Sequence, residues 1–262
     1  MVKIAFMFLI GRTIQYEDVW TSFFNQGLDS EYSIYVHAKK KSDTDLSPFF
    51  KKHLIPSVYT KWGDLILAEY QLLKYAYKDR NNKYFVLISD TTIPLKSFRE
   101  VYNEITGTSK SRMCEFENRR KSTQKTWDYS NMKGHVDRKD LRKHHQWITL
   151  VRPHVEIVLK NRNKVDLWDM RNEYIVADET YIGTLLQTKK QKNIKNICDT
   201  YVNWERTKDG NSPHTYESID INELIDLLAS DYLFARKFTK TCVIKKNKRK
   251  ICGLHDFLLE YI

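Results

Sequence analysis

The sequence predicts an α/β fold in which helices flank a mostly parallel central sheet. Across the first hundred residues, short apolar runs alternate with amphipathic segments, which is the order of strands and helices in α/β proteins. The apolar runs are continuous, as is typical of strands that are buried on both faces. Apolar residues form 41% and charged residues 29% of the 262 positions, a composition that excludes disordered and collagen-like chains.

The first three strands are predicted at residues 3–9, 32–37 and 84–88, where apolar runs end close to glycine or polar residues. Two helices separate these strands. Residues 16–24 carry three large aromatic side chains on one side, and residues 64–77 repeat apolar positions at helical spacing. Both segments therefore present an apolar stripe that can cover one face of a sheet.

Shorter elements are expected in the rest of the chain. We predict a short strand at residues 112–116 and a long loop with a short helix over residues 117–145. Further helices are predicted at residues 97–105, 151–160, 178–186, 223–228 and 254–261. Neither an internal repeat nor a linker interrupts this order, so we expect a single domain that spans residues 1–262.

Ligands of open α/β sheets bind beyond the carboxyl ends of the strands. The segments to search are therefore those that follow Leu9, His37, Tyr59 and Ile88. Trp62 lies in one of them, at an expected strand-to-helix junction. An aromatic side chain at that place either packs in the core or stacks on the base or sugar of a ligand.

The chain is basic, with 44 Lys and Arg against 33 Asp and Glu and a formal net charge of +11. A basic protein attracts phosphate, whether in nucleic acid, anionic lipid or a phosphorylated small molecule. Much of the excess lies in lysine runs at 39–41, 189–190 and 245–250, which we interpret as solvated surface. A nucleic-acid-binding module remains an alternative, although its interleaved basic and exposed aromatic residues are not evident here.

The longest apolar run near the start, residues 4–10, is too short for a membrane span or a signal peptide. We therefore expect a soluble, cytoplasmic protein without a transmembrane segment. The abundance of Lys, Asn and Ile is typical of an AT-rich genome and favours a microbial or viral origin. The cysteines show neither a CxxC motif nor zinc-ligand spacing, so we expect four free thiols and leave a Cys242–Cys252 disulfide open.

Common nucleotide and catalytic motifs are missing from the sequence. It contains no glycine-rich phosphate loop, no GxSxG and no HExxH, which argues against P-loop enzymes, Rossmann dehydrogenases and several hydrolases. Asp43-Thr44-Asp45 has the DxD form of a metal-diphosphate site, but it lies in a lysine-flanked polar loop and is interpreted as a turn. Asp90, at a strand end, lacks a second acid nearby. We therefore expect no metal site.

Three further groups carry possible chemistry. Asp178-Glu179 either complements the dipole of the helix that follows or supplies a general base at the mouth of a cleft. Arg236-Lys237 lies inside the apolar string 233–238, whose flanks could aim the two cations at a phosphate; the alternative is an exposed basic pair. His144-His145 has no carboxylate at useful spacing and is interpreted as surface.

Seven short strings, in order along residues 3–238, resemble one known family. They are Lys3-Ile4-Ala5-Phe6, Tyr35-Val36-His37, Val58-Tyr59-Thr60-Lys61-Trp62-Gly63, Leu87-Ile88-Ser89 through Ile93-Pro94-Leu95, Gln146-Trp147, Asp178-Glu179 and Leu233-Phe234-Ala235-Arg236-Lys237-Phe238. The chain resembles the core-2/I-branching N-acetylglucosaminyltransferases (glycosyltransferase family 14), which also include the peptide O-xylosyltransferases.

The resemblance implies a GT-A-type fold and an inverting, metal-independent transfer of a sugar. Residues 1–110 would form the nucleotide-binding half, and residues 111–262 the acceptor and catalytic half. The implied donor is UDP-GlcNAc, with UDP-xylose or another UDP-sugar as the alternative. The implied acceptor is a hydroxyl group of a glycan or glycoprotein, and no further cofactor is implied.

The same resemblance implies roles for individual residues. Glu179 matches the catalytic base, and Arg236 and Lys237 match the cations that hold the diphosphate. The other donor-site matches are Leu9, Tyr59, Thr60 and Trp62, and the acceptor-side matches are Glu115, Gln146 and Trp147.

Two positions depart from the pattern of the family. Lys39 stands where the family commonly has an acid near the uracil ring. A basic residue expected some 25 positions before the Arg-Lys pair is missing, and Arg206 is the nearest substitute, so we include it among the donor-binding candidates. Both positions bear on the identity of the donor.

Overall fold

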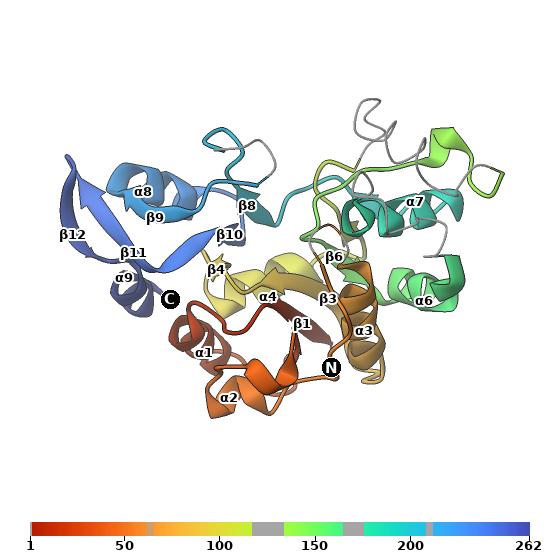
Figure 1. Ribbon diagram of the computed structural model, residues 1–262, viewed down its shortest axis with the longest axis horizontal. Coiled ribbons are helices and arrows are strands. Elements are labelled where there is room, and N and C mark those ends of the chain that lie inside the picture. The colour runs from red at the N-terminus through yellow and green to blue at the C-terminus, as the bar shows by residue number, and fades with distance from the viewer. Residues whose placement is uncertain (1, 62, 64, 117–133, 165–175, 208–211) are drawn as a thin grey trace.

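The computed structural model (Figure 1) describes residues 2–61, 63, 65–116, 134–164, 176–207 and 212–262. Its central feature is a six-stranded sheet in the order β2-β1-β3-β6-β5-β7. The bounds of these strands are β1 (Lys3–Ile10), β2 (Tyr32–Ala38), β3 (Asn82–Ser89), β5 (Ser111–Arg112), β6 (Thr149–Val151) and β7 (Ile194–Lys195).

The strand directions create the edge at which a ligand can bind. β1 runs parallel to both β2 and β3, with Phe8 opposite Val36 on one side and Ile88 on the other, so three carboxyl ends lie together. β6 runs antiparallel to β3 and to β5. Because β6 is reversed, the chain that enters it, including Gln146 and Trp147, arrives at this same edge. The predicted mostly parallel sheet is confirmed, with β6 as its reversed strand.

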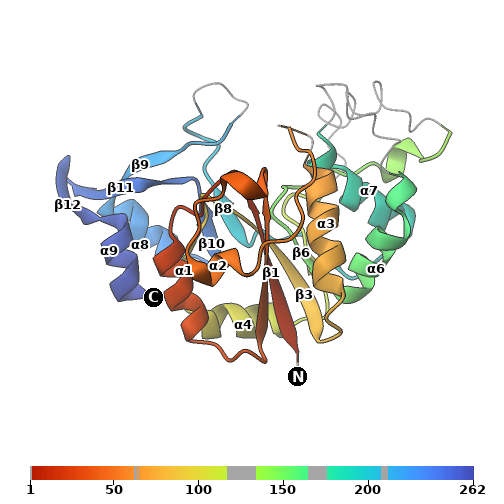
Figure 2. The same ribbon diagram turned by 60° about the horizontal axis from the view of Figure 1, so that its bottom comes forward.

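Helices cover both faces of the sheet (Figures 1 and 2). On one face lie α1 (Glu17–Asn25), α2 (Pro48–Lys51) and α4 (Phe98–Thr106), and on the other α3 (Ile66–Tyr77), α6 (Arg152–Lys160) and α7 (Tyr181–Thr188). The last helix, α9 (Leu254–Tyr261), packs against α1 and β11. Successive side chains of β1 point to opposite faces of the sheet. Phe6 and Phe8 pack in the core on the side of α1, and Met7 and Leu9 pack in the core on the side of α3. This explains the unbroken apolar run at residues 4–10.

Two small sheets extend the fold at the C-terminal side, as Figure 2 shows. One has the order β4-β10-β8, and the other β12-β11-β9. Their bounds, with the helix that follows β9, are β4 (Ile93–Pro94), β8 (Thr200–Val202), β9 (Tyr216–Asp220), α8 (Ile221–Ala229), β10 (Phe234–Arg236), β11 (Phe238–Lys246) and β12 (Arg249–Gly253). Pairing of β10 with β4 brings Arg236 beside the end of β3.

Several predicted elements differ in extent. The strand expected at 112–116 ends at Arg112, and Glu115 adopts a positive φ of 53°, which a regular strand does not contain. Residues 58–61, which precede the expected strand-to-helix junction at Trp62, form no regular strand. The loop expected at 117–145 falls partly on 117–133, outside the described residues; beyond it Arg138–Asp140 form a 3-10 turn.

The helix expected over 178–186 is interrupted. A 3-10 turn, η4 (Ala177–Glu179), comes first, and α7 begins only at Tyr181. Thr180, between them, has φ of −135°, which is not helical. Asp178 and Glu179 therefore lie on a tight turn ahead of a helix rather than in its first turn.

The expectation of four free cysteines is wrong. Cys114 and Cys198 form a disulfide across a sequence separation of 84, while Cys242 and Cys252 are free thiols. The physical reason is the pairing of β5 with β7, which aligns Arg112 with Lys195 and so brings the two cysteines together. Because disulfides are characteristic of oxidising compartments, this pair gives no support to the expected cytoplasmic location. Within the described residues, no helix has the length and apolar character to cross a membrane.

Candidate active site

A pocket of about 340 Å³ lies at the carboxyl ends of β1, β2 and β3, within the size range of small-molecule sites. Leu9 and Gly11 line it from the end of β1, and Lys39 from the end of β2. The backbone N–H of Lys39 donates to the carbonyls of Ile10 and Gly11, which joins these two strand ends. The position agrees with the sequence-based expectation for a ligand site.

One wall of the pocket carries cations. The guanidinium of Arg236 lies 4.2 Å from the ring centroid of Trp147, and its Nε donates to Ser89 Oγ at 3.1 Å. Burial lowers the pKa of Arg236 to about 10, against the opposing charges of Asp90 and Glu179, so the side chain stays protonated at neutral pH. A charged group fixed by stacking and one hydrogen bond is suited to binding an anion.

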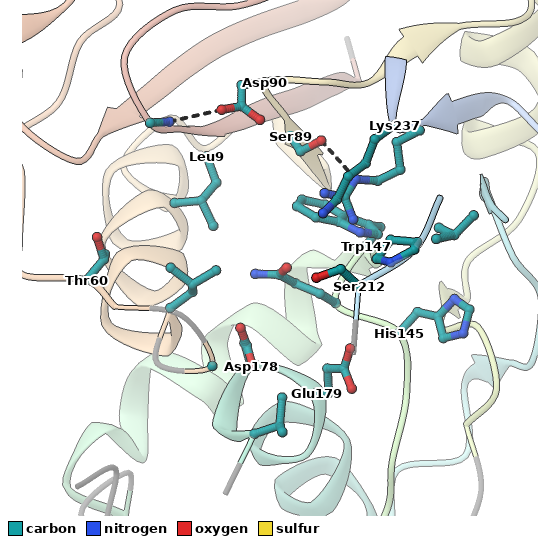
Figure 3. Close-up of a pocket in the computed structure, with 18 of the residues that line it drawn as sticks. Leu9, Thr60, Ser89, Asp90, His145, Trp147, Asp178, Glu179, Ser212 and Lys237 are labelled. Carbon is teal, nitrogen blue, oxygen red and sulfur yellow. Dashed lines mark hydrogen bonds between the residues drawn. The ribbon is translucent and has the colours of Figure 1, made fainter. Parts of the chain in front are cut away.

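Lys237 follows directly and also lines the pocket (Figure 3). The residues that flank the pair, Phe234 and Ala235 before it and Phe238 after it, are fully buried. Their packing fixes the backbone that carries the two cations, as the apolar string suggested.

Asp90, at the end of β3, has a structural partner. Its Oδ2 accepts a hydrogen bond from the Gly11 N–H at 3.2 Å, and its carbonyl accepts one from the N–H of Gln15. Burial raises the pKa of Asp90, while this hydrogen bond and the charges of Arg236 and Lys237 act in the opposite direction. Asp90 thus ties the turn after β1 to the end of β3 beside the cations.

The opposite wall carries carboxylates. Figure 3 shows Asp178 and Glu179 on the side of the pocket away from Lys237 and Asp90. Asp178 is buried, whereas Glu179 is partly exposed, and its Oε2 forms an ion pair with Lys143 Nζ. Because both carboxylates come from the η4 turn, its geometry sets where they point.

His144 and His145 are not surface residues, contrary to the sequence-based interpretation. His145 lines the pocket, and its Nε2 lies 3.3 Å from Glu115 Oε2. Burial lowers the pKa of His145, although the charges of Glu115 and Glu179 oppose this shift. His144 is fully buried, accepts a hydrogen bond from the Gly183 N–H at 3.3 Å, and has its pKa lowered by burial to about 4. The carboxylate partner, Glu115, is distant in the sequence and could not be found by spacing.

Gln146 and Trp147 form the floor between the two walls. Trp147 is stacked under Arg236, as described, and Gln146 Nε2 donates to Glu69 Oε1 at 2.9 Å. Glu69 lies in the core on α3. A buried acid, Glu69, therefore fixes the position of Gln146 in the pocket floor through this hydrogen bond.

The structure brings most of the candidate residues to one place. Those that line the pocket are Leu9, Thr60, Gln146, Trp147, Glu179, Arg236 and Lys237. Tyr59 is 75% exposed and is not among the lining residues. Glu115 faces His145 instead, and Arg206 pairs with Glu223 at 2.9 Å, so neither lines the pocket in this structure. Trp62 lies outside the described residues.

Sequence reasoning gave no role to several residues at this site, among them Ser89, His145 and Lys143, the partner of Glu179. Ser89 could have been found, because it directly follows the strand predicted at 84–88. Lys143 was hidden in a basic stretch, and its ion pair with Glu179 joins segments 36 residues apart.

Cations that face carboxylates across a cleft at the ends of parallel strands are suited to an enzyme that transfers a phosphate-linked group. The sequence profile of the Core-2/I-Branching enzyme family matches residues 4–227, and the chain belongs to this family. The protein is accordingly a glycosyltransferase, as the resemblance implied.

Glycosyltransferase BC10 of Oryza sativa subsp. japonica is 25% identical to the chain over 307 aligned positions, which cover 93% of this chain and 75% of the relative. Among solved structures, an active-site mutant of LgtC is similar with a TM-score of 0.44 and 9% identity, over 89% of this chain and 87% of that one.

Proposed function

We propose that the protein transfers a sugar, in the first place GlcNAc, from a UDP-sugar to a hydroxyl group of a glycan or glycoprotein. The transfer inverts the anomeric carbon and needs no metal ion. One observation carries the proposal: Arg236 and Lys237 line one wall of a pocket whose opposite wall presents Glu179. The diphosphate of a nucleotide sugar and the proton of an attacking hydroxyl group thus each have a partner.

The reaction is a single displacement. The acceptor oxygen forms a bond to the anomeric carbon while the bond from that carbon to the diphosphate oxygen breaks. Glu179 takes the hydroxyl proton, and the electron pair of the broken bond leaves with the nucleoside diphosphate. Lys143, paired with Glu179, keeps the carboxylate oriented until the acceptor binds.

The leaving group gains negative charge in a half-enclosed site. Arg236 offers a planar set of donors and Lys237 a compact charge, and both are already in place before the reaction. Stacking on Trp147 and the bond to Ser89 reduce the reorganisation that the guanidinium must undergo.

The same arrangement supports metal independence. Asp90, the acid at the strand end, is bound to a backbone N–H and lies beside two cations, which compete with any metal ion for it. In the DxD string, Asp43 Oδ2 lies 3.8 Å from Lys40 Nζ in an exposed turn. The pocket therefore offers the diphosphate side chains that carry positive charge themselves.

Lys39 bears on which nucleobase the donor carries. Lys39 lines the pocket at the ends of β1 and β2, where a cation favours different nucleobase contacts from an acid. A UDP-xylose or other UDP-sugar transferase is the alternative. Nucleic-acid binding is not favoured, because Asp178 and Glu179 would repel a polyanion from this pocket.

A metal-free thermal-shift panel of UDP-, GDP- and TDP-sugars tests the proposal. The donor is expected to raise the melting temperature selectively, since a ligand that binds only the native state stabilises it. NMR of the product formed from that donor then gives the anomeric configuration, which is expected to be inverted. Stabilisation by none of the nucleotide sugars, or a retained configuration, contradicts the proposal.

A further inference from the structure

Glu69 is an acid placed where an ionised carboxylate is costly. It lies in the middle of α3 with 2% of its surface exposed. Its Oε1 accepts the hydrogen bond from Gln146, while Oε2 is buried and has no hydrogen-bond partner among the described residues. A buried charge with an unsatisfied oxygen is strongly unfavourable, whereas a neutral carboxylic acid at this place costs much less.

The surroundings of Glu69 favour the neutral form. Burial raises the pKa of Glu69 well above its usual range, and the charges of Asp178 and, to a lesser extent, Glu179 raise it further. The hydrogen bond from Gln146 opposes these effects only in part. Two acids that share one buried region cannot both ionise easily, and Glu69, the more enclosed of the two, holds the proton.

Glu69 also lies where three segments of the site meet. α3 carries Glu69, the segment before β6 carries Gln146, and η4 carries Asp178 and Glu179. The rest of its surroundings is apolar, because Glu69 shares a small cavity with Met7, Leu73, Phe85 and other core residues. An apolar residue would suit this cavity better for stability alone, so the acid is kept at a cost, as is typical of functional sites.

We propose that Glu69 is a positioning residue that carries a proton, accepting the Gln146 amide through Oε1 and donating its acid proton toward Asp178. This link fixes the pocket floor and the η4 turn in one arrangement, and thereby holds Glu179 in the direction of the acceptor. The inference rests on the proposed role of Glu179 as the base.

Two substitutions separate positioning from packing. Glu69→Leu removes both hydrogen-bonding functions but fills the cavity, so we expect an unchanged or raised melting temperature. In the same variant kcat for transfer from UDP-GlcNAc falls about 10- to 100-fold, the scale of a small misplacement of reacting groups, while the donor KM changes little. Glu69→Gln offers an oxygen to Gln146 and an N–H to Asp178, and is expected to restore kcat to near the wild-type value. Gln71→Leu, on the same helix and outside the pocket, is the matched control.

An infrared measurement tests the proton itself. The wild-type protein at neutral pH is expected to show the carbonyl band of a protonated carboxylic acid, and Glu69→Gln is expected to lose it. Absence of the band, or wild-type kcat in Glu69→Leu, overturns the proposal; so does an equal loss of kcat in the Leu and Gln variants. If Glu69→Leu does not fold, the band and the Gln variant still decide. Glu179→Gln, assayed in parallel, shows separately whether the proposed base has failed.

Discussion

Arg236 keeps its positive charge although burial opposes ionisation, and this charge makes the pocket suited to binding an anion. The lowering of its pKa to about 10 leaves it protonated at neutral pH, and the Trp147 ring and Ser89 hydroxyl fix its plane. A fixed cation next to Lys237 is an anion site that exists before the ligand arrives. The two residues therefore act together on the diphosphate in the proposed reaction.

Replacing Lys237 with alanine removes one of these cations. We expect Lys237→Ala to weaken nucleotide-sugar binding by about 1.5–3 kcal/mol, the range for a hydrogen bond to a charged group. Isothermal titration calorimetry measures the difference directly. Lys250→Ala, an exposed lysine on β12, is the control and should bind as the wild type does. Equal affinities for Lys237→Ala and wild type would place the diphosphate elsewhere.

The proposed role of Glu179 as the base predicts a change in turnover rather than in donor binding. Glu179→Gln keeps the size of the side chain but cannot accept the hydroxyl proton. Turnover should fall by about 100-fold or more, the usual scale for a general base, with donor affinity retained. Steady-state kinetics together with calorimetry separates the two effects. Transfer close to the wild-type rate would remove Glu179 from the mechanism.

At the scale of elements, the contact between α7 and the segment before β6 positions the carboxylates. Gly183, in the first turn of α7, approaches His144 so closely that an added Cβ would lie 2.6 Å from His144 Cδ2. The Gly183 N–H also donates to the same ring. This close approach keeps α7, and the η4 turn ahead of it, against the pocket floor.

Gly183→Ala tests that contact. The added methyl group forces a shift of a buried ring, so we expect the free energy of unfolding to fall by about 1–3 kcal/mol, the usual cost of overpacking. Urea denaturation gives the value, and Gln187→Ala on the same helix serves as the control. If Gly183→Ala is as stable as the control, the close approach is not a constraint.

The elements that the sequence predicts well are those with a local physical cause. β1 is apparent because seven consecutive apolar residues serve two cores, and α9 because its apolar positions repeat at helical spacing. The end of β5 was missed because Glu115 leaves the strand with a positive φ, for which glutamate gives no local signal.

In the candidate site, too, the residues that the sequence predicts are those with a local signal. Arg236, Lys237 and Glu179 were found from apolar flanks, adjacent acids and the family strings. The roles of Lys143 and Glu69 were not found, because these residues reach the site through pairings between distant segments. The Cys114–Cys198 disulfide was missed for the same reason.

At the scale of the whole molecule, buried neutral histidines make stability depend on pH. His37, His144 and His154 are almost fully buried, and burial lowers the pKa of each. A histidine whose pKa is lower in the folded than in the unfolded state stabilises the fold fully above about pH 6.5. Its contribution is lost as the pH falls, because the unfolded chain then binds the proton first.

His144 isolates this effect, since its folded pKa is about 4. We expect the stability difference between wild type and His144→Gln to shrink by up to about 1.4 kcal/mol for each pH unit below 6.5. Urea denaturation of both proteins between pH 7.5 and 4.5 measures it. A difference that does not change over this range would mean that the His144 pKa is not lowered by folding.

The central claim is that two side-chain cations, rather than a metal ion, balance the charge of the departing diphosphate. The initial rate of sugar transfer in excess EDTA tests it most directly. With Arg236 and Lys237 in place, the rate should equal that measured in the presence of manganese. Loss of activity in EDTA, with recovery on addition of manganese, would contradict the account and return Asp90 or the Asp43 and Asp45 pair to consideration as metal ligands.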